Sequence, residues 1–149
     1  MITINLSNFQ EISNYLKEMN SSFIPELDTR VDIDRYAQKI ADNAVRLEYR
    51  ENDKLIGLLA FYVNIENQYS FITTFSIKPE FQGKGHATEL MNKMLSIQNE
   101  YPQIDRIELE VNDLNQKAKG FYKNYGFEQI KKSQDILVLS KSVNQVNRN

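Results

Sequence analysis

The segment that most limits the fold is LIGLLAFYV, residues 55–63, which is apolar at odd and even positions alike. Successive side chains of a β-strand point to opposite faces of the sheet, so other layers must cover both faces of this strand. Residues 45–50 alternate apolar and charged side chains, and residues 51–53 (END) supply a turn, which predicts a hairpin. We therefore expect an α/β fold whose central sheet has helices on both faces.

Periodicity and turn chemistry predict the other elements. Apolar residues at helical spacing favour helices over 9–19, capped by Ser7 with Gln10, and over 33–41, capped by Asp32. Further helices are expected from residue 87 and over 115–125, where Gly126 ends the second one. The remaining strands are expected over 70–77, 106–111, 127–131 and 136–140. Residues 1–141 form one domain in this prediction, and the polar residues 142–149 form a frayed tail.

Composition argues against several classes of function. The chain has 18 Lys and Arg against 20 Asp and Glu, which is unlike the strongly basic surface of most nucleic-acid-binding domains. Cysteine is absent and there is one histidine, so we expect no disulfide, no cysteine nucleophile and no metal site. The first residues lack a secretory pattern, and no apolar run approaches the roughly 20 residues of a membrane span. We therefore expect no membrane and no nucleic-acid partner, and a cytoplasmic location.

The stretch QGKGHAT, residues 82–88, lies between a predicted strand and a predicted helix. Glycine allows backbone N–H groups to approach an anion, and the N-terminus of the next helix adds unpaired amides and a positive dipole end. This pattern predicts a phosphate-binding loop, although two glycines alone also suit a plain tight turn. It is not a nucleoside-triphosphatase loop, because a single Lys84 separates the glycines, and Thr88 replaces the third glycine of the dinucleotide motif.

Two motifs resemble those of one family. The stretch QGKGHA fits Gln/Arg-x-x-Gly-x-Gly/Ala and resembles the coenzyme A pyrophosphate loop of the GNAT superfamily of N-acetyltransferases. Residues 111–127, VNDLNQKAKGFYKNYGF, resemble the closing segment of that superfamily. The resemblance covers residues 55–140 and implies a mixed, mostly antiparallel sheet flanked by helices on both faces. It also implies that strand 70–77 bulges and splays from strand 106–111 to hold coenzyme A.

The resemblance implies roles for individual residues. Tyr122 corresponds to the general acid, although an aromatic residue on this helical face also suits core packing. Glu110 corresponds to a general base, a role that a partly buried carboxylate would suit, while a solvated strand face is an equal alternative. The implied coenzyme A-binding residues lie on strand 70–77, in the loop and at the start of the last helix: Phe75, Ser76, Ile77, Gln82, Gly83, Lys84, Gly85, His86, Ala87, Thr88 and Asn115.

Three of these residues have open alternatives. Asn115 also suits a helix cap, and Lys84 suits either a phosphate contact or a solvated position. His86 occupies a variable position and is expected to contribute its amide near phosphate rather than to act as a base. The backbone N–H of Phe75 or a neighbour is expected to polarise the thioester carbonyl.

Together these features predict an acyltransferase. Acetyl-coenzyme A would donate an acetyl group to a primary amine of a small molecule or peptide, by direct attack in a ternary complex. A monomer or a homodimer is expected. The alternative is a non-catalytic acyl-coenzyme A sensor or regulatory module of the same fold. Glu26 and Asp28 could attract a cationic acceptor, and Phe23 and Tyr36 could pack against its apolar part.

Overall fold

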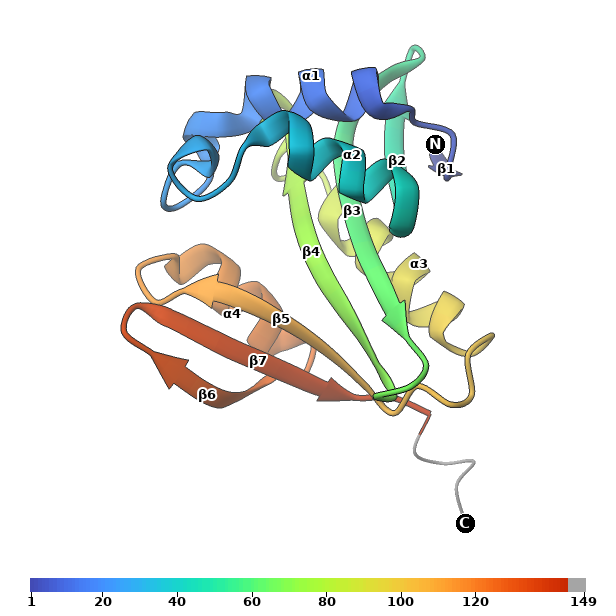
Figure 1. Cartoon of the computed structure of the whole chain (residues 1–149), viewed down its shortest axis with the longest axis vertical. Coiled ribbons are helices and arrows are strands. Elements are labelled where there is room, and N and C mark those ends of the chain that lie inside the picture. The colour runs from blue at the N-terminus through green and yellow to red at the C-terminus, as the bar shows by residue number, and fades with distance from the viewer. Residues whose placement is uncertain (145–149) are drawn as a thin grey trace.

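A mixed seven-stranded sheet forms the centre of the computed structural model, which describes residues 1–144 (Figure 1). The strand order is β1-β2-β3-β4-β5-β7-β6, and every neighbouring pair is antiparallel except β4 and β5. The strands are β1 Ile2–Ile4, β2 Val45–Glu51, β3 Lys54–Asn64, β4 Tyr69–Ile77, β5 Arg106–Asn112, β6 Glu128–Ser133 and β7 Ile136–Ser142. The predicted mixed, mostly antiparallel sheet is confirmed, and the short β1 is an element that the sequence did not predict.

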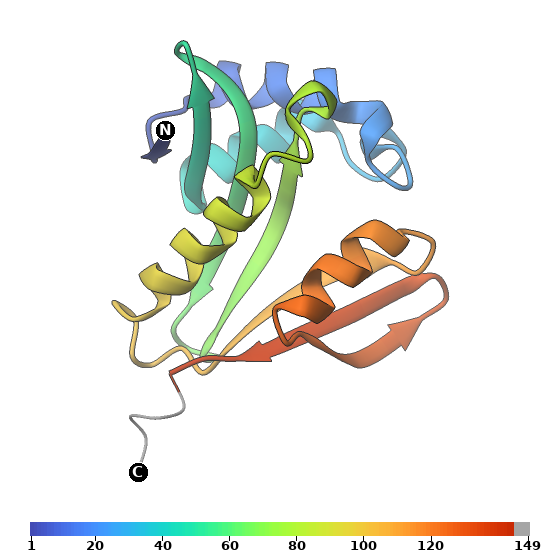
Figure 2. The same ribbon diagram turned by 180° about the vertical axis from the view of Figure 1, so that it is seen from behind.

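Helices cover both faces of this sheet (Figures 1 and 2). On one face lie α1, Phe9–Met19, and α2, Ile33–Asn43, which the short 3₁₀ turns η1, Asn20–Ser22, and η2, Leu27–Thr29, connect. On the other face lie α3, His86–Gln98, and α4, Gln116–Asn124. The turn η3, Pro79–Phe81, stands between β4 and α3. None of the helices within residues 1–144 is both long enough and apolar enough to cross a membrane.

β3 is buried on both faces, as its composition predicts. Leu58 and Ala60 pack against the α1 and α2 layer, while Leu59 and Phe61 pack in the larger core with α3. A register shift against β2 makes Ile56 an extra residue, and it points into the larger core. Burial of each large side chain stabilises the fold by roughly 1.5–3 kcal/mol, which ties the two layers to one central strand.

The start of α1 differs from the prediction, because Asn8 rather than Ser7 caps the helix. The Asn8 side chain accepts a hydrogen bond from the backbone N–H of Glu11. Ser7 is buried, and its hydroxyl and carbonyl oxygens each accept a hydrogen bond of 3.0 Å from the Arg46 guanidinium. The predicted Asp32 cap of α2 is confirmed by its bond from the N–H of Arg35.

Glu48 of β2 holds the N-terminal segment in place. Its carboxylate is 0% exposed and accepts hydrogen bonds from the Thr3 hydroxyl at 2.6 Å and from the backbone N–H groups of Leu6 and Ser7 at 3.1 and 2.5 Å. Burial by itself would raise the pKa of Glu48, but these hydrogen bonds outweigh it and hold the pKa below its ordinary value. The carboxylate is therefore charged at neutral pH and stabilises the N-terminal segment in that form.

Glu48→Gln is expected to lower the free energy of unfolding by about 3 kcal/mol, because an amide cannot replace a buried acceptor of several hydrogen bonds. The lowered folded-state pKa means that this contribution is present above the ordinary carboxyl range and is lost as pH falls through the folded-state value. The free energy of unfolding of the variant should therefore fall less steeply with decreasing pH than that of the wild type. Urea unfolding at neutral and acidic pH measures both effects. The exposed Glu51, at the end of the same strand, supplies the control Glu51→Gln, which should change stability by less than about 0.5 kcal/mol.

β4 and β5 separate along their length, as the resemblance implies. They pair only over residues Tyr69–Ile72 of β4 and Arg106–Leu109 of β5, whereas β4 continues beside β3 to Ile77. A register shift against β3 leaves Thr73 as an extra residue at the point where the separation begins. Figure 1 shows the two strands adjacent at one end and apart at the other.

The segment after residue 141 is attached to the domain as far as it is described. Ser142 pairs with Arg106, and the Val143 N–H donates to the carbonyl of Asp105. The Asn144 side-chain amide lies 2.9–3.0 Å from the carbonyl oxygens of Gln98, Tyr101 and Ile104. The rest of the predicted tail, residues 145–149, lies outside the described residues.

Candidate active site

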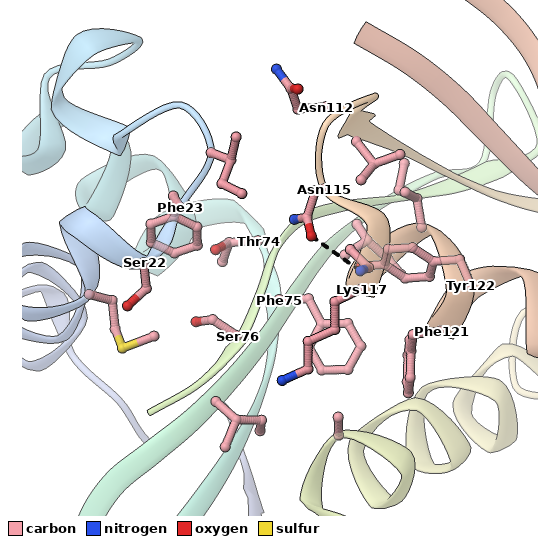
Figure 3. Close-up of a pocket in the computed structure, with 18 of the residues that line it drawn as sticks. Ser22, Phe23, Thr74, Phe75, Ser76, Asn112, Asn115, Lys117, Phe121 and Tyr122 are labelled. Atoms are coloured by element: carbon pink, nitrogen blue, oxygen red, sulfur yellow. Dashed lines mark hydrogen bonds between the residues drawn. The ribbon is translucent and has the colours of Figure 1, made fainter. Parts of the chain in front are cut away.

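A cavity of about 660 Å³ occupies the space between the separated strands (Figure 3). Its walls come from β4, the glycine loop, the start of α3, β5, α4 and the connection between α1 and α2. All of the catalytic and coenzyme A-binding residues expected from the sequence line it except Lys84. Segments far apart in the chain therefore contribute to one cavity.

The glycine loop is open toward this cavity. Gly83 and Gly85 have φ angles of 78° and 86°, a left-handed conformation that glycine adopts without steric cost. A Cβ atom added at either position would meet no atom within 4 Å. Gly85 is the N-cap of α3, so the unpaired amides and positive dipole end of that helix lie beside the loop. This arrangement suits the pyrophosphate of coenzyme A.

Gln82 fixes the loop between β4 and α4. Its side-chain amide donates to the Ile77 carbonyl oxygen at 3.0 Å, and its side-chain oxygen accepts from the Lys117 ammonium at 2.9 Å. Lys84 instead lies over the Phe81 ring, with its ammonium nitrogen 5.5 Å from the ring centre. Lys117 lines the cavity, and the sequence motifs did not mark it.

His86 packs beneath the loop. Its side chain is 11% exposed, and its ring centre lies 4.1 Å from that of Tyr49. Neither ring nitrogen has a hydrogen-bond partner among the described residues, and the Nδ1 atom is 3.7 Å from a carboxylate oxygen of Glu89. The ring therefore supports the start of α3, and the position contributes its backbone to the loop.

Two tyrosine hydroxyls donate hydrogen bonds to backbone carbonyl oxygens in and after the bulge of β4. Tyr36 donates to the Thr73 carbonyl oxygen at 2.6 Å, and Tyr15 donates to that of Ser76 at 3.1 Å. Burial raises the pKa of Tyr36 to about 12, so this hydroxyl stays protonated near neutral pH. Beyond Ile72, no strand of residues 1–144 pairs with β4 on its β5 side. The backbone N–H and C=O groups on that side therefore lie beside the cavity without a strand partner among residues 1–144.

Tyr122 combines a packed ring with an unpaired hydroxyl. The side chain is 8% exposed, and its ring lies against those of Phe75 and Phe121 (Figure 3). The ring of Phe127 also lies against it. Within residues 1–144, no group hydrogen-bonds the hydroxyl, although the residue lines the cavity. Burial raises its pKa, so the phenol remains protonated and can act as an acid.

Asn115 caps α4, which accounts for one of its expected roles. Its side-chain oxygen accepts from the Ala118 N–H at 3.2 Å, as the dashed line in Figure 3 shows. The side-chain NH₂ has no partner in the described part of the chain, and the residue lines the cavity. A cap and a ligand contact are therefore compatible.

Glu110 is exposed on β5 and lines the cavity, so of the two alternatives left open by the sequence the structure shows the solvated strand face. The strand places it near the edge of the opening, where solvent reaches the carboxylate. Glu108, two residues earlier, forms a 2.5 Å ion pair with Arg106 and does not line the cavity. The two glutamates therefore have different surroundings.

The connection between α1 and α2 forms one wall of the cavity, and its sequence contains no recognisable motif. Phe23 and Tyr36 line the cavity as expected, whereas Glu26 and Asp28 do not. Ser22 and Arg30 are lining residues that the sequence did not indicate. Neither periodicity nor spacing marks such positions, because an irregular connection acquires its role only by lying over β4.

The chain belongs to the GNAT family of acetyltransferases, whose family model matches residues 9–127. It is 32% identical over 129 residues to the spermidine N(1)-acetyltransferase of Vibrio cholerae, which covers 83% of this chain and 69% of the relative. This membership makes the chain an acyltransferase.

Solved structures of N-acetyltransferases share the fold at low sequence identity. The PaiA N-acetyltransferase of Thermoplasma acidophilum, solved in complex with coenzyme A, has a TM-score of 0.75 and 15% identity over 95% of this chain and 99% of that protein. The ribosomal-protein-S18-alanine N-acetyltransferase of Escherichia coli has a TM-score of 0.78 and 14% identity over 100% of this chain and 98% of that protein.

Proposed function

We propose that this protein transfers the acetyl group of acetyl-coenzyme A to a primary amine by direct attack in a ternary complex. The observation that carries the proposal is one cavity that contains the open glycine loop, the unpaired edge of β4 and the Tyr122 hydroxyl. The loop and the start of α3 would bind the pyrophosphate, and β4 would guide the pantetheine arm. Relatives that acetylate spermidine or a protein alanine support an amine acceptor.

In the proposed reaction the amine nitrogen forms a bond to the acetyl carbon and the carbon–sulfur bond breaks. The Phe75 N–H or a neighbouring amide stabilises negative charge on the carbonyl oxygen. Glu110 accepts the proton of the amine, directly or through water, and Tyr122 gives its proton to the leaving thiolate. Solvent then returns both residues to their starting protonation states. No covalent enzyme intermediate is required.

Release of free thiol from acetyl-coenzyme A tests this proposal against a panel of amines. The panel includes amino acids, an N-terminal peptide, an amino sugar and spermidine, with coenzyme A affinity measured by calorimetry. Thiol release that depends on the amine, with the acetylated amine detected by mass, supports the proposal. Micromolar coenzyme binding without turnover on any amine would instead favour the non-catalytic sensor.

Glu110→Gln is expected to lower kcat/KM at least 10-fold, because a positioned base typically contributes 10²–10⁴-fold and water can replace part of it. Steady-state kinetics with a saturating amine measure this effect. Glu108→Gln is the matched control, because Glu108 lies on the same strand but pairs with Arg106 outside the cavity. Equal kinetics in the two variants would remove Glu110 from the mechanism.

A further inference from the structure

Arg30, an exposed residue, places a positive charge on the cavity wall formed by the connection between α1 and α2. It follows η2 in the connection between α1 and α2, and it lines the cavity together with Phe23 and Tyr36. Its guanidinium makes no hydrogen bond or ion pair with another residue within 1–144. On the same wall, the Tyr36 hydroxyl donates to the Thr73 carbonyl oxygen in the bulge of β4.

The nearby acidic residues do not neutralise this charge. Glu26 and Asp28 are exposed and outside the cavity wall, and Glu26 accepts from the Asn20 side chain at 3.4 Å. Across the cavity, Glu110 is the one carboxylate among its described lining residues. The other basic groups of the wall, Lys117 and His86, lie on α4 and α3, and Lys117 is bonded to Gln82 of the loop. The cavity therefore combines one carboxylate, on β5, with one unpaired guanidinium, in the connection between α1 and α2.

The same connection also supplies apolar surface. Phe23 is half-buried, Leu27 is buried, and Ile24 is 46% exposed, and all three line the cavity. Figure 3 shows Phe23 and Ser22 on the side of the cavity opposite Tyr122 and Phe121. An acceptor bound here would contact an apolar wall as well as the two charges.

We propose that the acceptor is a small primary amine that also carries an anionic group, which Arg30 binds while the amine faces Glu110. This inference rests on the proposed acetyl transfer and names the class of its second substrate. A guanidinium binds a carboxylate or phosphate through paired hydrogen bonds, which makes it selective for those groups. A polyamine would place a second ammonium near Arg30, where like charges repel. The acceptor preference therefore differs from that named for the spermidine-acetylating relative.

Matched amines test this preference. L-leucine and L-leucinamide differ in the carboxylate, O-phosphoethanolamine and ethanolamine differ in the phosphate, and spermidine is the polycation. In Arg30→Gln, kcat/KM for the favoured anionic amine should fall roughly 10- to 100-fold, the usual range for a charge-assisted hydrogen bond. Its neutral partner should change less than about 3-fold. For each pair of amines, the ratio of the two kcat/KM values is compared between the wild type and Arg30→Gln. This comparison cancels the different basicity of the two amines. Arg35→Gln is the control, because Arg35 is exposed on α2 and does not line the cavity.

A binding measurement separates this inference from the proposed function. N-acetyl-L-leucine, N-acetyl-L-leucinamide and O-phosphoethanolamine are titrated by calorimetry into protein saturated with coenzyme A, so turnover is not needed. Tighter binding of an anionic ligand that Arg30→Gln abolishes supports the inference even if no amine is acetylated. No tighter binding of either anionic ligand than of the neutral amide, unchanged affinity of Arg30→Gln for the favoured anionic ligand, or a kinetic preference for spermidine would each overturn it.

Discussion

Gly85→Asp is expected to weaken coenzyme A binding by at least 100-fold while the fold survives. The added carboxylate would project into open space at the start of α3, where we propose that the pyrophosphate binds. Two unit charges 4 Å apart near a protein surface repel by about 4 kcal/mol, and each 1.4 kcal/mol changes affinity tenfold. The left-handed backbone adds a cost of about 1–2 kcal/mol that Asp tolerates better than most residues. Calorimetry with coenzyme A and a melting curve measure affinity and folding separately.

Two controls isolate the effect of the charge. Gly85→Asn has nearly the same shape and backbone strain without the negative charge, so its affinity should lie much closer to that of the wild type. Gly120→Asp adds the same charge on α4, at an exposed position outside the cavity, and should bind coenzyme A normally. Unchanged affinity in Gly85→Asp would show that the pyrophosphate binds elsewhere. Equal losses in the Asp and Asn variants would assign the effect to loop geometry.

Tyr122→Phe is expected to lower kcat by roughly 100-fold or more, the usual contribution of a positioned general acid. The ring contacts with Phe75, Phe121 and Phe127 remain, and the lost hydroxyl has no partner among residues 1–144. Melting temperature and coenzyme A affinity should therefore hardly change. Since burial raises the pKa of Tyr122, the wild-type acid should stay protonated, and activity that depends on it should persist, beyond the ordinary tyrosine range.

Tyr125→Phe, a substitution at the end of α4, is the control and should change stability rather than turnover. The Tyr125 hydroxyl lies 2.9 Å from the Asn92 side-chain oxygen and 3.3 Å from the Thr88 carbonyl oxygen, and Tyr125 does not line the cavity. Loss of the hydroxyl should therefore cost about 1 kcal/mol of stability with near-normal turnover. Stopped-flow measurement of thiol release and thermal melting on both variants separates chemistry from packing. Near-normal turnover in Tyr122→Phe would leave water as the proton donor. Loss of folding in that variant would instead indicate a structural role for the hydroxyl.

Many structural features of this protein are encoded by short stretches of its sequence. The left-handed glycines before α3, the Asp32 cap and the positive-φ Gly126 after α4 each follow from a few adjacent residues. The apolar run of β3 is similarly local, because two-sided burial requires apolar residues at every position. Such patterns allowed the helices, most of the strands and the glycine loop to be predicted.

Long-range contacts decided the features that the sequence did not reveal. Ser7 has a typical capping side chain, yet Arg46 and Glu48 of β2 bind it, and Asn8 becomes the cap. The exposure of Glu110 depends on the separation of β4 from β5, which no property of β5 alone encodes.

The sequence by itself determined the order of elements, the two-sided burial of β3 and the position of the glycine loop. Each follows from backbone conformation or side-chain periodicity within a short window. Only the tertiary structure brought Arg30 and Lys117 to one cavity, because Arg30 lies in an irregular connection and the motif around Lys117 gives that residue no role. Their surroundings come from segments as far apart as the connection after α1 and the start of α4. The physical reason is that a side chain's charge and contacts acquire a function only when packing decides which distant groups face it.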